Sequence, residues 1–339
     1  MRPSRLRLAD TDDQSSIASI EVPIDGEHVT VALTELRPLR RAEVSDAVLA
    51  GLEPHLQASA DHDADDAAGL RSSAGLPVST GDATTSTGPV RVALVAGELQ
   101  PGRFVVDLLG HVRLGDEERW HGAGYVLVRP SSDPAVTGAH PQLHGFHDPP
   151  QKSIYSDRGY ARRWREPLPD SLRLDLFALD DAAEPTDVLS AGYLQANGIF
   201  VSTALADDLR GFTISNGHWF DAVATRRGEQ HRLQFLQLLP SGAIDFERST
   251  FRIDGGIHHS IREVVQLDDL DAVEALRAEL VRSQHRPALV PDSIVMASHP
   301  DLFSVPASTD IAMSIGLLTG LNERGRTGID VVVPDYPLG

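Results

Sequence analysis

The chain has 339 residues, no cysteine, a formal net charge of −19 and 41% hydrophobic residues. The length favours two domains, or one large domain with appendages. The lack of cysteine excludes disulfides, thiolate zinc sites and cysteine nucleophiles. The negative charge disfavours binding to nucleic acids and to anionic membranes.

The first 56 residues favour a small α/β segment. Strands are expected at 17–24 and 28–36, and apolar residues at helical spacing predict a helix over 41–52. Residues 57–89 are rich in Ala, Ser, Thr, Asp and Gly, with too little apolar surface to offset the entropy of ordering. We therefore expect a flexible linker or disordered insertion at 57–89.

A β-rich domain is expected over 90–165. The segments 90–97 and 103–114 are rich in β-branched residues and flank Pro101-Gly102, which predicts a hairpin. A third strand is expected at 124–130. The proline-rich passage 131–169 predicts loops at the surface.

The region 166–339 contains one pattern twice. An apolar run ending in serine precedes two leucines in 199–209 and again, with identical spacing, in 311–321. Ser202 and Ser314 are each placed to cap a helix, and a glycine and a short strand follow each pattern. The sequence therefore predicts a strand–helix–strand unit and leaves an internal repeat of it open.

Between these patterns, strands are expected at 233–239 and 243–253, and apolar spacing predicts a helix over 270–282, with Val281 on its apolar face. Strands and helices both occur, without a βαβ series. The sequence therefore predicts an α+β fold of mainly antiparallel sheets with packed helices, in two domains.

The sequence contains none of the common phosphate-binding, dinucleotide-binding, nucleophile-elbow or zinc-protease motifs. One candidate metal site remains, made of His140, His144, His147 and Asp148. These residues would serve a metal-dependent hydrolase if their side chains converged. The alternative is a set of solvent-exposed histidines in an irregular segment, since a proline-rich loop fixes no common face.

Two acidic segments are candidates for binding or catalysis. Asp245 and Glu247 alternate with apolar residues, and we expect them on one face of a strand, either as an acid–base pair or as a solvated face. Alternation around Phe220 would bury its ring and expose Trp219 with Asp221, or the reverse. The candidate partner-binding residues are Trp219, Asp221, Asp245, Glu247 and Asp254.

Three segments carry a resemblance to a known family. These are GIFVSTALADDL, AIDFERSTF, and PDLFSV followed after a gap by ERGRTGIDVVV. Together they resemble the bacterial polymorphic-toxin immunity family numbered eleven, and its relative numbered forty-three, over about residues 188–333. The resemblance implies that 166–339 is an immunity-like α+β domain and that the protein neutralises a cognate toxin by binding it, with no activity of its own and no cofactor.

These observations all favour a protein that acts by binding a partner. The charge of −19 suits steering towards a basic protein toxin. Because the chain has neither a bilayer-spanning apolar run nor the apolar core of a secretory signal, we expect a cytoplasmic location. Two alternatives stay open, the metal-dependent hydrolase and an adaptor or chaperone for a secreted effector.

Overall fold

The computed structural model describes fourteen stretches of the chain, namely residues 19–24, 27–32, 37–43, 76–100, 103–113, 120–122, 124–144, 166–168, 174–191, 197–255, 262–283, 287–332, 334 and 336–339. Its contacts divide the chain into two units. Unit 1 comprises Met1–Leu127 and Val331–Gly339, and unit 2 comprises Val128–Asp330. The division therefore lies near residue 127, whereas we expected a boundary near residue 165.

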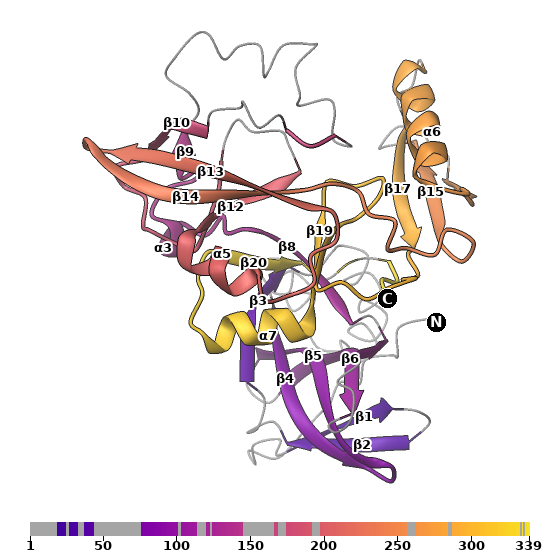
Figure 1. Ribbon diagram of the computed structural model, residues 1–339. Coiled ribbons are helices and arrows are strands. Elements are labelled where there is room, and N and C mark those ends of the chain that lie inside the picture. The colour runs from indigo at the N-terminus through magenta and orange to yellow at the C-terminus, as the bar shows by residue number, and fades with distance from the viewer. Residues whose placement is uncertain are drawn as a thin grey trace. The chain divides into compact units, whose positions relative to one another are not determined.

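Unit 1 is built from β-strands (Figure 1). They are β1 Ser19–Ile24, β2 Glu27–Ala32, β3 Arg37–Glu43, β4 Leu76–Thr85, β5 Gly88–Gln100, β6 Arg103–Arg113 and β7 Trp120–Gly122. β1 and β2 form an antiparallel pair, and β3 to β7 are neighbours in chain order. The end of β20 (Ile329–Val332) runs parallel to β3. The strands expected at 17–24, 28–36, 90–97 and 103–114 are confirmed where the structure describes them, although β5 is longer than expected at both ends.

Valines hold this unit together. Val22, Val29 and Val31 from the β1–β2 pair are buried with Val90 and Val92 of β5. Burying each such side chain contributes roughly 1.5–3 kcal/mol to stability. The core of unit 1 is therefore made by side chains from its first hairpin and from β5.

Two expectations for unit 1 are wrong. Of the linker expected at 57–89, residues 57–75 lie outside the described residues. Residues 76–89 are not a linker, because β4 pairs antiparallel with β5 from Val78 to Thr85 and packs Ala83 on the valine cluster. The backbone bonds come from β5, so β4 needs few apolar side chains of its own. The helix expected at 41–52 is also wrong at its start, since 41–43 belong to β3, and residues 44–52 lie outside the described residues.

Unit 2 contains helices and strands. Its elements are β8 Tyr125–Pro130, α3 Pro134–Thr137, β9 Leu143–His144, β10 Leu174–Leu179, β11 Val188–Leu189, β12 Gly198–Ser202, α5 Thr203–Leu209, β13 Gly217–Arg226, β14 Glu229–Leu238, β15 Thr250–Asp254, β16 Arg262–Val265, α6 Leu270–Arg282, β17 Ala288–Ser293, β18 Leu302–Ser304, β19 Ile311–Ser314 and α7 Ile315–Glu323. The division between the units falls within β8 and β20.

A six-stranded sheet with the order β11-β12-β14-β13-β10-β9 dominates unit 2. Its pairs are antiparallel except that β10 runs parallel to β13. A three-stranded antiparallel sheet has the order β16-β15-β17, and β18 pairs antiparallel with β19. The fold is thus α+β with mostly antiparallel sheets and few helices, as expected.

The six-stranded sheet has a core on each face. On one face the rings of Phe177, Phe200 and Phe235 pack with centroids 4.7 and 4.8 Å apart. On the other face Ile199, which alternates with Phe200, lies with Leu205 and other side chains of α5. Apolar residues on both faces of β12 explain why its sequence reads as a continuous apolar run.

The expected serine caps are present. Ser202 Oγ accepts the N–H of Leu205 at 3.1 Å at the start of α5, and Ser314 Oγ accepts the N–H of Leu317 at 3.1 Å at the start of α7. Each bond satisfies one backbone donor that the first helical turn leaves open.

The helix expected at 270–282 is also present as α6, with Asp269 as its cap. Val281 is not on its buried face, however, and is 67% exposed. None of the described helices is long and apolar enough to cross a membrane.

Candidate binding surface

The strands β13 and β14 form a long hairpin (Figure 1). Trp219 and Asp221 lie two positions apart on β13, so their side chains share one face of the hairpin. Phe220 packs against the phenylalanine core and Asp221 is exposed, so strand alternation puts Trp219 on the face opposite Phe220. Of the two orientations that the sequence allowed, the structure shows the one that exposes Asp221 beside Trp219.

A polar network holds these two side chains. Gln234 lies directly opposite Asp221 in the register of β13 and β14, and its Nε2 donates to Asp221 Oδ1. Arg210, at the C-terminus of α5, donates to Gln234 Oε1 at 3.4 Å and lies over the Trp219 ring at 5.2 Å from its centroid. A guanidinium over an indole face contributes about 0.5–1 kcal/mol at an exposed site.

Asp207 completes the network by pairing with Arg210. We call these five residues, Asp207, Arg210, Trp219, Asp221 and Gln234, the Trp219 surface. The side chain of Asp207 is 74% exposed and that of Arg210 is 49% exposed, so the network faces solvent. It presents two carboxylates held by hydrogen bonds and an aromatic ring that lies under a guanidinium. Side chains that are ordered in this way lose little conformational entropy when they are covered.

Sequence reasoning found Trp219 and Asp221 but missed the three residues that position them. Asp207 and Arg210 lie one helical turn apart at the end of a helix that the sequence did predict. To predict the contact of Gln234 with Asp221, one would need to know the register of the hairpin, because the two residues lie thirteen positions apart. Such cross-strand pairs become visible only once the turn at Arg227-Gly228 is placed.

The other three candidate residues lie elsewhere. Asp254 is on β15, in the three-stranded sheet. Asp245 and Glu247 do not share a strand face, so that expectation is wrong: the carbonyl of Asp245 accepts the N–H of Ser249 at 2.9 Å, closing a turn. A side chain that can bond its own backbone favours a turn over a strand.

The candidate metal site is only half within the described residues. His140 is exposed, and His144 in β9 pairs its Nε2 with Asp180 Oδ2 at 2.8 Å. His147 and Asp148 lie outside the described residues. Among the residues that the structure describes, no three His, Asp or Glu side chains are grouped to hold a metal ion.

Sequence reasoning also missed Asp180. Its Oδ1 accepts the N–H of Ala182 at 2.8 Å, and this bond, followed by the bond to His144, lowers the pKa of the carboxyl below its ordinary value of 3.8. Both side chains of the pair are partly exposed. The pair is therefore a partly exposed hydrogen bond that joins β9 to the residue after β10.

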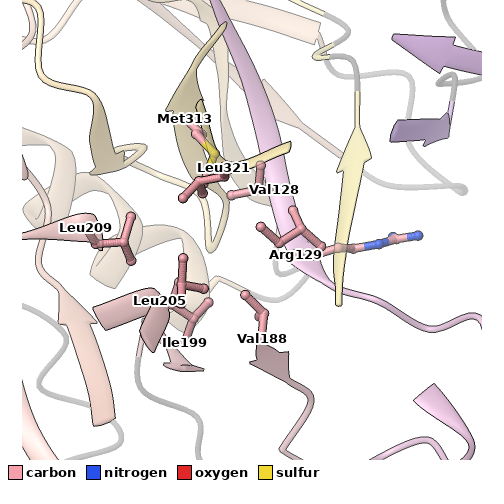
Figure 2. A pocket seen from close by; sticks show the side chains of 9 residues that line it. Val128, Arg129, Val188, Ile199, Leu205, Leu209, Met313 and Leu321 are labelled. Atoms are coloured by element: carbon pink, nitrogen blue, oxygen red, sulfur yellow. The ribbon is translucent and has the colours of Figure 1, made fainter. Parts of the chain in front are cut away.

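A small pocket in unit 2 is lined by nine residues, eight of them apolar (Figure 2). Val188, Ile199 and Leu205 face Met313 and Leu321 across it, while the guanidinium of Arg129 extends away. It has room for about one water molecule. The pocket is therefore a packing gap between elements and not a ligand site.

Comparisons of the chain with protein-family models, with curated proteins and with solved structures found no match.

Proposed function

We propose that this protein is an immunity protein that binds a cognate bacterial toxin and neutralises it by stoichiometric contact in the cytoplasm. The observation that carries the proposal is the Trp219 surface. A tryptophan and an arginine in one hydrogen-bonded patch are the residue types that dominate binding energy at protein interfaces. The resemblance of residues 188–333 to the immunity family supports the same assignment.

The charge of the chain supports a basic partner. With a net charge of −19, the protein attracts cations over a Debye length of about 8 Å at physiological salt. Asp207 and Asp221 direct this general attraction to the edges of Trp219. A toxin with a lysine- or arginine-rich patch around an apolar contact fits this arrangement.

We further propose that the binding function resides in unit 2. All five residues of the Trp219 surface belong to it, and so do nearly all residues of the family resemblance. The capped strand–helix pattern that occurs twice also belongs to this unit. The strand of its first occurrence, β12, pairs with β14 of the hairpin.

Co-expression tests the proposal. The protein is produced in a bacterial host together with the product of the adjacent upstream gene, and growth and co-purification are scored. We expect the neighbouring product to arrest growth, the protein to restore it, and the two to purify together. Arrest that is not relieved by the protein, or relief without a complex, would sink the proposal.

A variant control makes this test specific. D207K/D221K changes the Trp219 surface, whereas E184K/E323K makes the same change of net charge at exposed glutamates elsewhere in unit 2. We expect growth to fail with the first variant and to recover with the second. Equal rescue by both would remove the Trp219 surface from the interface.

A further inference from the structure

An aspartate precedes each of the two capped helices at the same structural position. Asp187 precedes β11 and Asp301 precedes β18, and these strands pair antiparallel with β12 and β19. The N–H of Ser202 donates to the carbonyl of Asp187 and the N–H of Ser314 to that of Asp301, each at 2.8 Å. The serine hydroxyls donate to Oδ1 of the same aspartates, at 2.6 and 2.9 Å respectively.

The second carboxylate oxygen of each aspartate reaches across to the other helix. Asp187 Oδ2 accepts the N–H of Thr327, which follows α7, at 3.0 Å. Asp301 Oδ2 accepts the N–H of Thr213, which follows α5, at 2.9 Å. Each carboxylate therefore joins the start of its own helix to the loop that leaves the other one.

Backbone hydrogen bonds also join each loop to the opposite segment. The carbonyl of Thr327 accepts the N–H of Val188 at 3.1 Å. The carbonyl of Thr213 accepts the equivalent N–H of Leu302 at 3.3 Å, and also the N–H of Asp301 at 2.7 Å. Both loops are thus paired with the first strand of the opposite segment. The same cross-connection occurs in both directions.

The two sequences agree once they are aligned on these contacts. Asp-Val-Leu-Ser begins at Asp187 and Asp-Leu-Phe-Ser at Asp301, while Arg-Gly-Phe-Thr ends at Thr213 and Arg-Gly-Arg-Thr at Thr327. The same number of residues separates the aspartate from the threonine in each. α7 has 9 residues and α5 has 7, and a shorter connection before Ser314 offsets the difference.

The helices also share one core. Leu209 and Leu321 each lie seven positions after the capping serine, and both line the small apolar pocket of unit 2 (Figure 2). Arg326, after α7, donates to Asp208 of α5 at 2.7 Å. The aligned residue after α5 is Phe212, which lies under Arg324 with 5.9 Å between its ring centroid and the guanidinium.

From these contacts we infer that residues 187–213 and 301–327 are two copies of one structural unit, interlocked by Asp187 and Asp301. Neither copy satisfies all of its polar groups by itself. Each aspartate needs the threonine N–H of the other copy, and each loop needs the opposite first strand. The two copies therefore open and close together as one cooperative element. This behaviour does not depend on what the Trp219 surface binds.

Hydrogen exchange of the full chain tests the interlock. In D187A, amide exchange is expected to rise more than tenfold in both 198–209 and 315–327, and D301A should accelerate the same two segments. D310A is the matched control, because the hydrogen bonds of Asp310 to described residues stay within its own loop, with Ser308 and Val305. Acceleration confined to the copy that carries the substitution would overturn the inference.

D187N covers the case in which D187A does not fold, since the asparagine keeps one acceptor oxygen. It should show the same two-segment pattern with smaller amplitude. The double variant D187N/D301N supplies an independent measurement: because either change already releases both copies, its loss of unfolding free energy should be less than the sum of the single losses. Additive losses would overturn the inference.

Discussion

At the scale of single residues, the most specific feature is the arrangement around Trp219. Trp219 is partly buried and Arg210 lies over its ring. Arg210 also pairs with Asp207, and Gln234 donates to Asp221. A rigid aromatic residue with fixed polar neighbours loses little entropy when a partner covers it. The arrangement therefore favours binding over any solvent-exposed structural role.

Trp219→Ala should weaken partner binding by about 2 kcal/mol or roughly 30-fold, because hot-spot tryptophans contribute on this scale. Calorimetry with the purified product of the neighbouring gene, which we propose is the toxin, measures the affinity, and the melting temperature shows whether the fold is kept. Asp245→Lys with Glu247→Lys asks separately whether the turn before β15 takes part in the interface. Unchanged affinity in W219A would place the interface elsewhere.

Asp180 gives a prediction for acid stability. Because its pKa is lowered on folding, the ionised carboxylate stabilises the folded state above about pH 4, and this contribution is lost as pH falls through 3.8 towards the lowered pKa. Asp180→Asn lacks the contribution at every pH. The difference in unfolding free energy between wild type and D180N, measured in urea, should therefore shrink between about pH 5 and pH 2.5. A difference that stays constant over this range would contradict the assignment.

At the scale of elements, two glycines with positive φ allow two costs of a substitution to be compared. Both have a left-handed backbone, but only one of the two has neighbouring atoms that an added Cβ would meet. Gly328 has φ +81° and a Cβ there would lie 2.3 Å from the carbonyl oxygen of Val188. Gly228, in the β13–β14 turn, has φ +86° with no atom within 4 Å of such a Cβ. Both positions favour glycine, but only Gly328 lies against another chain segment.

Gly228→Ala should cost about 1–2 kcal/mol of unfolding free energy from the left-handed backbone alone. Gly328→Ala should cost about 1–3 kcal/mol more, since the added carbon forces β11 and the loop after α7 apart. Denaturant unfolding of the two variants measures the difference. Equal losses would mean that the chain relaxes freely around Gly328.

Elements that form through local interactions were predicted from the sequence. Elements that depend on pairing with distant segments were not. Helix α6 was predicted to the residue, because its cap Asp269 and its apolar spacing are local signals. β4 was missed, because its order comes from pairing with β5 and from a valine cluster built partly by β1 and β2. The turn at Asp245 was read as a strand, because alternation of apolar residues outweighed the local bonding of its backbone.

The candidate site shows the same limit. Alternation placed Trp219 and Asp221 on one face, but the residues that hold them come from α5 and β14. The repeated serine pattern predicted both caps. Asp187 and Asp301 carried no signal of their own, because each acts through a threonine on a distant loop.

At the scale of the whole molecule, charge determines how a partner approaches. A net charge of −19 creates a long-range attraction for a basic protein that salt screens. The association rate with the neighbouring toxin should fall about tenfold or more between 50 and 500 mM NaCl, while the dissociation rate changes little. Stopped-flow or surface-plasmon measurements separate the two rates. An association rate that is insensitive to salt would exclude electrostatic steering.

The central claim is that the protein acts by stoichiometric binding and not by catalysis. The most direct measurement titrates it into the purified product of the neighbouring toxin gene in a calorimeter and then records the intact mass of both proteins. The account predicts heat that saturates at a fixed molar ratio, with both masses unchanged. A partner that is cleaved or covalently altered by a small fraction of one equivalent would contradict it.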